Sequence, residues 1–202
     1  MANPYTLNAQ QYFDQYQQLS FESAHAAWTH LLSSSRRPSR AIDIGAGSGR
    51  DAAALAARGW QVLAIEPSEG LRRLGEAATA TSNIDWLSDQ LPHLPVLHEL
   101  HGGISASLIL VSAVWMHLTP DEQTTALPVL AQLLEPNGLL VITLRHGHGP
   151  SPDERVFYET NSAVLKAHGE SLGLDTVLLT SDDDKLQRRD VFWETIVFRK
   201  KG

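Results

Sequence analysis

The 202-residue sequence contains no cysteine, which excludes disulfide bonds, thiolate zinc sites and thiol catalysis. It also lacks a long apolar run, since no segment approaches the roughly 20 residues that a membrane-spanning helix needs. The amino-terminal residues have neither the basic nor the apolar region of a signal peptide. From these absences we expect a cytoplasmic protein with no membrane partner.

Basic residues are also in short supply. Lys and Arg together number 16 against 23 Asp and Glu, which gives a net charge of −7 and a sequence pI near 5.7. Because binding along a phosphate backbone depends on clustered positive charge, we expect no nucleic-acid partner. The length and a hydrophobic fraction of 43% suit one buried core, so the sequence predicts a single domain over residues 1–202.

The most informative segment that is present runs from Ala41 to Arg50. Its first residues form a short β-branched strand, and three glycines, Gly45, Gly47 and Gly49, follow at intervals of two. Glycines at a strand end allow a sharp turn and let the backbone approach a ligand. The alternative to a ligand-binding turn is a tight strand-to-helix turn that binds no ligand.

An acidic residue favours the ligand-binding interpretation. Glu66 ends a second apolar strand and lies seventeen residues after Gly49, where a carboxylate can accept hydrogen bonds from both hydroxyls of a ribose. The dinucleotide-binding pattern needs a third Gly or Ala three residues after Gly47, and this sequence has Arg50 there, so the fit to NAD is imperfect. The pattern GxGxG with Asp43 two positions before it suits a nucleoside such as S-adenosylmethionine, which has no pyrophosphate.

Strand and helix patterns alternate along the rest of the chain, which predicts a parallel sheet with helices on both faces. Two helical pieces are expected within residues 8–32, followed by a loop over 33–38. Further ranges follow in order: helix 51–58, strand 61–66, helix 68–80, strand 83–87, a proline-punctuated stretch 92–101, strand 107–113, helix 120–134, strand 139–145 and helix 153–172. Two final strands, 174–180 and 191–198, share a short polar connection and are therefore expected to be antiparallel.

With Asp43, the three glycines and Glu66, the chain resembles the class I S-adenosylmethionine-dependent methyltransferases, and its opening resembles uncharacterised bacterial members. The resemblance covers nearly the whole chain. It implies a Rossmann-like α/β fold with a seven-stranded sheet in the order 3-2-1-4-5-7-6, whose last strand is antiparallel. It also implies S-adenosylmethionine as cofactor and S-adenosylhomocysteine as product.

The cofactor-binding residues follow from that resemblance. The expected set is Asp43, Gly45, Ala46, Gly47, Gly49, Glu66, Pro67, Asp89, Gln90, Leu91 and Val111. Family members place an acidic residue after the third strand to accept the adenine amino group; Asp89 fits this role, and Asp85 is the second candidate. Trp86 and Leu87 could sandwich the adenine or belong to the core.

Two segments are candidates for the acceptor site, because loops at the carboxyl ends of parallel strands line the ligand crevice. His117 could act as a base, or it could be a structural residue near a helix start. Trp115, two residues before it, is a candidate substrate contact. Arg145 and His146 begin the loop 145–150, in which His148 follows, and His146 is the second candidate base. Arg145 could pair with a substrate carboxylate or with a protein one. The sequence supplies no further ligands at recognisable spacing, so we expect no metal.

The aromatic segment near the amino terminus suggests a lid. In the family such segments fold over the cofactor, so we expect residues 1–35 to form a helical lid on a core of residues 36–202. Tyr16 and His25 are its candidate substrate contacts, although singly each aromatic residue is more often part of a core.

The function expected from the sequence is methyl transfer from S-adenosylmethionine to a small-molecule acceptor by direct in-line displacement. One alternative is an NAD(P)-dependent oxidoreductase, although the sequence has no Tyr-x-x-x-Lys or comparable hydride site. The other is a non-catalytic protein that binds S-adenosylmethionine or a related nucleoside.

Overall fold

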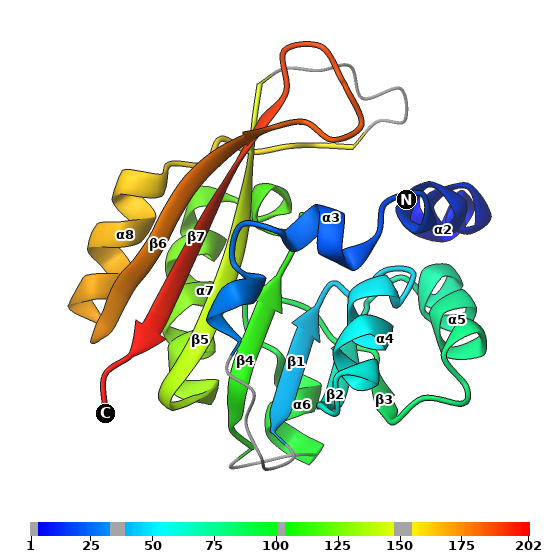
Figure 1. Ribbon diagram of the computed structural model, residues 1–202, viewed down its shortest axis with the longest axis horizontal. Coiled ribbons are helices and arrows are strands. Elements are labelled where there is room, and N and C mark those ends of the chain that lie inside the picture. Colours follow the sequence, from blue (N-terminus) through cyan, green and yellow to red (C-terminus); the bar gives the residue numbers. More distant parts are fainter. Residues whose placement is uncertain (1–3, 33–38, 101–103, 148–154) are drawn as a thin grey trace.

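A twisted, mostly parallel sheet forms the centre of the protein (Figure 1). The computed structural model describes residues 4–32, 39–100, 104–147 and 155–202. Its seven strands have the order β3-β2-β1-β4-β5-β7-β6, and their bounds are β1 Arg40–Ile44, β2 Gln61–Ile65, β3 Ile84–Leu87, β4 Ala106–Val111, β5 Leu134–His146, β6 Leu174–Asp183 and β7 Phe192–Lys200. Strand β7 runs antiparallel to both of its neighbours, β5 and β6, and the other strand pairs are parallel. The expected order and the reversed last strand are confirmed.

Helices cover both faces of this sheet (Figure 1). One face packs against α3 and α4, and the other against α6, α7, α8 and the short helix η2. The helices are α1 Pro4–Leu7, α2 Ala9–Gln17, α3 Phe21–His25, η1 Thr29–Leu31, α4 Arg50–Ala57, α5 Glu69–Ala78, α6 Pro95–Leu100, η2 Trp115–His117, α7 Pro120–Leu133 and α8 Ser162–Ser171. None of these described helices is long and apolar enough to cross a membrane.

Strand β1 shows why the two-sided core forms. Its side chains alternate between faces, so that Ile42 and Ile44 enter one apolar cluster while Ala41 enters the other. All three are almost completely buried, as expected for the central strand of a parallel sheet that is covered on both sides. This arrangement fixes the end of β1, and with it the start of the glycine turn.

The expected helix over residues 153–172 is wrong in its first half. Helix α8 begins only at Ser162, because the Asn161 side chain accepts hydrogen bonds from the first-turn N–H groups of Ala163 and Val164 at 3.0 and 3.1 Å. Residues 155–161 have no regular structure, and Tyr158 N–H donates to the Met116 carbonyl at 2.8 Å. This segment, which we call the 155–161 strap, therefore lies against η2.

Smaller departures occur elsewhere. The stretch 92–101 contains helix α6, whose Pro95 occupies its first position, and β5 begins at Leu134 rather than at residue 139. The expected loop over 33–38 and His148 lie outside the described residues. Between residues 8 and 32 the structure has three helical pieces, α2, α3 and the short η1, where two were expected, and α1 precedes them.

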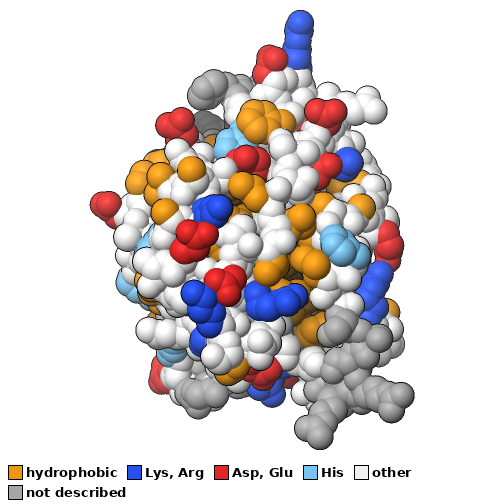
Figure 2. Space-filling view, turned by 60° about the vertical axis from the view of Figure 1, so that its left-hand side comes forward, with side chains coloured by type: hydrophobic (Ala, Val, Ile, Leu, Met, Phe, Trp, Pro, Cys, Tyr) orange, Lys and Arg blue, Asp and Glu red, His pale blue; other side chains and the backbone are white. Residues whose placement is uncertain are grey.

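Figure 2 shows the side of the molecule that carries α8 and β6. Positive and negative side chains are interspersed on this face around a group of apolar ones. The exposed large apolar residues of these two elements include Val164 of α8 and Val177 and Leu179 of β6. Among the side chains drawn in colour, this face has no large field of one sign of charge.

Candidate functional site

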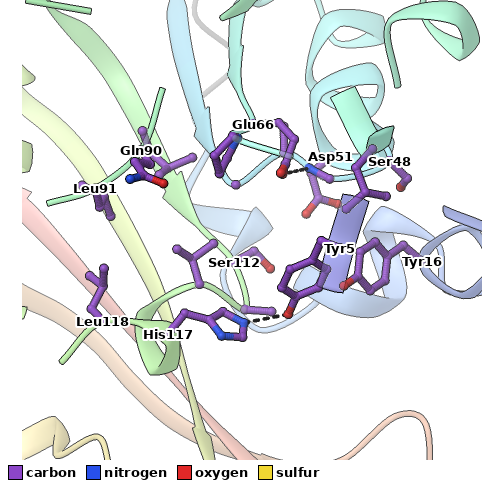
Figure 3. A pocket seen from close by; sticks show the side chains of 18 of the residues that line it. Tyr5, Tyr16, Ser48, Asp51, Glu66, Gln90, Leu91, Ser112, His117 and Leu118 are labelled. Atoms are coloured by element: carbon purple, nitrogen blue, oxygen red, sulfur yellow. Dashed lines mark hydrogen bonds between the residues drawn. The ribbon is translucent and has the colours of Figure 1, made fainter. Parts of the chain in front are cut away.

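A cavity of about 580 Å³ opens at the carboxyl ends of β1, β2 and β4. Two groups of lining residues face each other across it (Figure 3). We call the first the glycine wall, which comprises Ile44–Ser48, Arg50, Asp51, Glu66, Pro67 and Asp89–Leu91. We call the second the aromatic wall, which comprises Tyr5, Tyr16, Ser112–Val114, His117, Leu118, Arg155 and Val156. Ligands of open parallel sheets bind at this edge.

The glycine turn brings bare backbone to the cavity. Gly45 and Gly47 have φ values of +69° and +54°, which residues with a Cβ rarely adopt. A Cβ on Gly45 would overlap a methyl group of Val114, and one on Gly47 would lie 3.3 Å from the Tyr16 ring. The N–H groups of Gly45 and Ala46 both donate to the Ile65 carbonyl, at 2.8 and 3.0 Å, and so fix the turn against β2.

Glu66 closes the glycine wall. Its Oε2 accepts the Gly47 N–H at 2.9 Å (Figure 3). Its Oε1 accepts the Ser68 N–H at 2.8 Å. Burial raises the pKa of this carboxyl group, while the two backbone hydrogen bonds lower it. Each carboxylate oxygen has a second lone pair, so Glu66 can accept further hydrogen bonds from a pair of neighbouring hydroxyls.

Asp43 lies behind this wall and does not line the cavity. It is 2% exposed, and its Oδ2 has no hydrogen-bond partner in the described structure. Burial, and then the neighbouring Asp51, raise the pKa of Asp43 well above its usual value. An unpartnered buried carboxylate oxygen is costly, so a donor or cation supplied by a ligand would fit at this place.

Two other expected cofactor residues also lie outside the lining. Gly49 caps the start of α4 with a φ of +76°, and a Cβ there would meet the ring of Trp86. Val111 is fully buried at the end of β4, where the residues that reach the cavity are Ser112, Ala113 and Val114. Both residues thus shape the walls without contacting the cavity.

The third strand supplies the far end of the glycine wall. Asp89, Gln90 and Leu91 line the cavity as expected, whereas Asp85 is exposed on the edge strand β3. The Asp89 carboxylate accepts two backbone N–H groups, from Gln90 at 2.9 Å and from Leu97 at 2.8 Å, so it also braces the turn that leads into α6. Neither Trp86 nor Leu87 lines the cavity; a Cβ on Gly75 would overlap the Trp86 ring.

His117 is the titratable group of the aromatic wall. Before it, Ala113 adopts a φ of +57° and donates its N–H to the Thr143 hydroxyl at 2.7 Å, which turns the chain from β4 into η2. His117 Nε2 then lies 2.9 Å from the Tyr5 hydroxyl (Figure 3). Burial, and then the guanidinium groups of Arg155 and Arg145, lower the pKa of His117 to about 4, against a backbone hydrogen bond with Val156 that raises it. The imidazole is therefore neutral at pH 7.

Of the aromatic wall, only Tyr16 and His117 were expected site residues, and three of the others lie outside the two segments that were expected to form the acceptor site. Tyr5, Arg155 and Val156 line the cavity, although the first precedes the expected aromatic segment and the others fall within an expected helix. The spacings of seven and four residues between Tyr5, Tyr12 and Tyr16 are a signal that could have identified Tyr5, since these rings lie 4.8 and 6.0 Å apart. No pattern around Arg155 indicates its position.

Of the four expected substrate residues, only Tyr16 lines the cavity. His25 is buried, with Nε2 2.9 Å from the Asp51 carboxylate and Nδ1 accepting the Trp28 Nε1–H at 3.1 Å. Trp115 is 2% exposed and packs into the core on the α7 side. His25 and Trp115 therefore lie behind the walls of the cavity. The Asp51 carboxylate is the partner of His25, and the core surrounds Trp115.

The end of β5, which holds Arg145 and His146, also lies away from the cavity. Arg145 is 7% exposed and stacks over Phe157 with its guanidinium carbon 4.6 Å from the ring centre. His146, the second candidate base, lies 2.7 Å from Glu194 and stacks on Phe192. Within the described part of the chain, no group of three or more His, Asp or Glu residues is arranged to hold a metal ion.

Comparison with known sequences gives two matches. A family model described as a methyltransferase domain matches residues 42–142, half of the chain. An uncharacterized methyltransferase from Alkaliphilus oremlandii (strain OhILAs) is 30% identical over 105 residues. That match covers 50% of this chain and 43% of the Alkaliphilus protein, so the chain matches less than half of this relative's length.

Solved structures share the fold over almost the whole chain. The 1,6-didemethyltoxoflavin-N1-methyltransferase of Burkholderia thailandensis has a TM-score of 0.69 and 21% identity, and the alignment covers 100% of this chain and 92% of that one. The N-methyltransferase NodS of Bradyrhizobium japonicum WM9 has a TM-score of 0.72 and 17% identity, with 99% and 100% covered. The TM-scores show a common fold, and at identities this low the likeness concerns the fold alone.

Proposed function

Because the chain belongs to the class I S-adenosylmethionine-dependent methyltransferase family, we propose that it transfers a methyl group from S-adenosylmethionine to a small-molecule acceptor. The observation that carries the proposal is the Glu66 carboxylate beside the open glycine turn, at the edge of the sheet where ligands bind. The Burkholderia and Bradyrhizobium structures contain S-adenosylhomocysteine, and the first also contains 1,6-didemethyltoxoflavin, a small molecule.

The residues of the glycine wall fit the cofactor. Glu66 would accept the ribose hydroxyls, and Asp89 with Gln90 and Leu91 would hold the adenine. Asp43 lies behind this wall, so its unpartnered Oδ2 would reach the cofactor's amino group through water. When bound, S-adenosylmethionine supplies a methyl group that is already activated by its sulfonium.

The aromatic wall would then position the acceptor. In-line displacement requires the acceptor atom to be held about 3 to 3.5 Å from the methyl carbon, with no covalent bond to the protein. His117 is neutral and can take up a proton, but its pKa of about 4 makes it a weak base. It therefore suits an acceptor whose proton becomes acidic only as the methyl group arrives, and the Tyr5 hydroxyl on Nε2 would pass that proton to the ring.

We also propose that the amino-terminal helices act as a lid over this cavity. Tyr5 of α1 and Tyr16 of α2 line it. The Thr6 hydroxyl lies 3.1 Å from that of Ser68, next to Glu66, so the lid is attached beside the glycine wall. Covering the cavity would exclude water from the reacting atoms.

Calorimetry with S-adenosylmethionine, S-adenosylhomocysteine and NAD tests the cofactor assignment. We expect both sulfur nucleosides to bind and NAD not to bind; tight binding of NAD alone would overturn the proposal in favour of an oxidoreductase. Incubation with methyl-labelled cofactor and fractionated metabolites then tests transfer. A protein that binds the cofactor but labels no fraction would instead be a non-catalytic binding protein.

A further inference from the structure

A charged pair lies in the glycine wall, directly after the glycine turn. Arg50 and Asp51 are the first two residues of α4, and both line the cavity. The Asp51 carboxylate accepts the Arg50 Nε–H at 2.6 Å on one oxygen and an Nη2–H at 2.9 Å on the other. Two parallel hydrogen bonds of this kind fix the plane of a guanidinium group, so Arg50 is held in one orientation beside the cavity.

His25 supplies a further donor to the same carboxylate. Its Nε2 lies 2.9 Å from Oδ2 of Asp51, and its Nδ1 accepts the Trp28 Nε1–H at 3.1 Å. Because an indole N–H can only donate, Nδ1 carries no hydrogen, and the hydrogen of the ring must lie on Nε2, which donates it to Asp51. Both His25 and Trp28 are almost completely buried, so water does not compete for these hydrogen bonds.

The hydrogen-bonding capacity of Asp51 is largely used in this way. Burial would raise the pKa of Asp51, but His25 and the hydrogen bonds from His25 and Arg50 hold it below its usual value, so the carboxyl group is ionised at neutral pH. Its two oxygens accept from three donors. Asp51 therefore supports Arg50 from behind, and Arg50 is the member of the pair that can bind a ligand.

Two N–H groups of Arg50 remain for such a ligand. A guanidinium group has five N–H donors. In the described part of the chain, Arg50 uses two of them on Asp51 and one on the Tyr16 carbonyl, which Nη1 reaches at 3.4 Å. The described residues of the glycine wall include no other Lys or Arg. Paired guanidinium donors suit a carboxylate or a phosphate, and of these two groups S-adenosylmethionine has the carboxylate.

Asp43 lies close to the same guanidinium group. Burial, and then Asp51, raise the pKa of Asp43, and the charge of Arg50 opposes them. In the cofactor, the amino and carboxylate groups are bonded to one carbon atom, so the residues that bind them must also be neighbours. Asp43, for the amino group, and Arg50, for the carboxylate, meet this requirement.

We propose that Arg50 binds the carboxylate of the cofactor and that His25 is a positioning residue, which acts on Arg50 through Asp51. The proposal rests on the methyl-transfer function and assigns two further residues to its cofactor site. His25 belongs to α3 and lies outside the cavity. The amino-terminal region would thus contribute to cofactor binding through a buried side chain that never touches the cofactor.

Calorimetry with two nucleosides on the full-length protein tests the assignment of Arg50. Methylthioadenosine keeps the adenosine and the sulfur of S-adenosylhomocysteine but lacks the amino-acid group. We expect wild type to bind S-adenosylhomocysteine at least about tenfold more tightly, as for hydrogen bonds to a charged group. Arg50→Gln should remove most of this preference, because affinity for S-adenosylhomocysteine falls while affinity for methylthioadenosine stays unchanged.

Variants of His25 test its positioning role by the same preference. His25→Phe keeps an aromatic ring but removes the donor to Asp51, and should reduce the preference about threefold, as for one ordinary hydrogen bond. His25→Gln, whose amide can donate to Asp51, should retain more of it. Arg58→Gln is the matched control: it removes the ion pair with Glu22 and the stacking over Phe21, which also join α4 to α3, and should leave the preference intact.

The same measurements can overturn the proposal. If wild type binds S-adenosylhomocysteine no more tightly than methylthioadenosine, or if Arg50→Gln keeps the preference, Arg50 does not bind the carboxylate; the second result would point to a cation of the aromatic wall such as Arg155. His25 is not a positioning residue if His25→Phe keeps the preference, or if His25→Gln or Arg58→Gln loses as much of it as His25→Phe does. Equal loss of affinity for both nucleosides in the His25 variants would also exclude that role. Wild-type protein that binds neither nucleoside would overturn the methyl-transfer proposal instead.

Discussion

The glycine wall and the aromatic wall face the same cavity but are built in different ways. The glycine wall comes from three strand ends between residues 44 and 91, and backbone hydrogen bonds to the Ile65 carbonyl and to Glu66 fix it. The aromatic wall combines α1, α2, η2 and the 155–161 strap, and side chains hold it together. Local sequence therefore specifies the proposed donor site, whereas the proposed acceptor site depends on the tertiary fold.

The largest expected effect comes from placing a side chain in the glycine wall. Gly45→Ala forces a Cβ onto a residue with φ +69° and into a Val114 methyl group, so the free energy of unfolding should fall by about 2 to 4 kcal/mol. Binding of S-adenosylhomocysteine should become undetectable. Denaturant unfolding and calorimetry measure the two quantities.

Gly59→Ala is the matched control. Gly59 has φ +88°, but no atom lies within 4 Å of the position that a Cβ would take. The free energy of unfolding should therefore fall only by the cost of the backbone conformation, about 1 to 2 kcal/mol. The variant should bind S-adenosylhomocysteine as wild type does. Equal losses in both variants would show that the glycine turn has no special relation to the cavity.

The next largest effect is the dependence of the unfolding free energy on pH, through His117 of the aromatic wall. The folded pKa of His117, about 4, lies below its ordinary value of 6.5, so protonation favours the unfolded chain. The resulting loss of stability should begin as the pH falls through 6.5, grow to about 3 kcal/mol and level off below about 4. His117→Gln should lack this component, so the difference in unfolding free energy between wild type and variant should change over this pH range. A constant difference from pH 8 to pH 4 would contradict the burial of a neutral imidazole.

A smaller effect is expected on the affinity for S-adenosylhomocysteine when the glycine wall loses a carboxylate. Glu66→Gln replaces the carboxylate that faces the cavity and should weaken S-adenosylhomocysteine binding by about 1.5 to 3 kcal/mol, as for the loss of a charge-assisted hydrogen bond. Glu76→Gln, which changes a half-exposed glutamate on α5, should bind as wild type does. Unchanged affinity in Glu66→Gln would remove Glu66 from the cofactor site.

The smallest effect should come from one hydroxyl of the aromatic wall. Tyr5→Phe removes the hydrogen bonds to His117 and Arg155 and should lower the unfolding free energy by about 1 kcal/mol, with no change in S-adenosylhomocysteine affinity. Tyr158→Phe, at an exposed position, should change neither quantity. If Tyr5→Phe weakened binding of the cofactor product, the separation between the two walls would fail.

The sequence predicted the glycine wall because its determinants are local. A strand, three glycines and an acidic residue after the next strand are adjacent or near in the chain, and the parallel register between β1 and β2 brings them together. Gly45, Gly47 and Glu66 accordingly lie at the cavity. The seven-strand order was predicted from the family resemblance.

The aromatic wall was predicted only in part, because its members meet through long-range contacts. His117 and Tyr16 were anticipated, but nothing near Arg155 indicates that it packs against Tyr5. The errors have a common cause: Trp115, His25 and His146 carry reactive or aromatic groups, yet packing or partners elsewhere in the fold occupy them. Residue type alone does not distinguish a residue that packs behind the cavity wall from one that lines the cavity.

The hydrogen bond between Tyr5 and Arg155 also has a consequence for folding. It joins residues 150 positions apart, so forming it closes a loop that includes most of the chain. The entropy cost of closing so long a loop falls once β1, β2, β4 and β5 have paired and brought the two ends close together. The aromatic wall should therefore be among the last parts to form during synthesis, after the glycine wall.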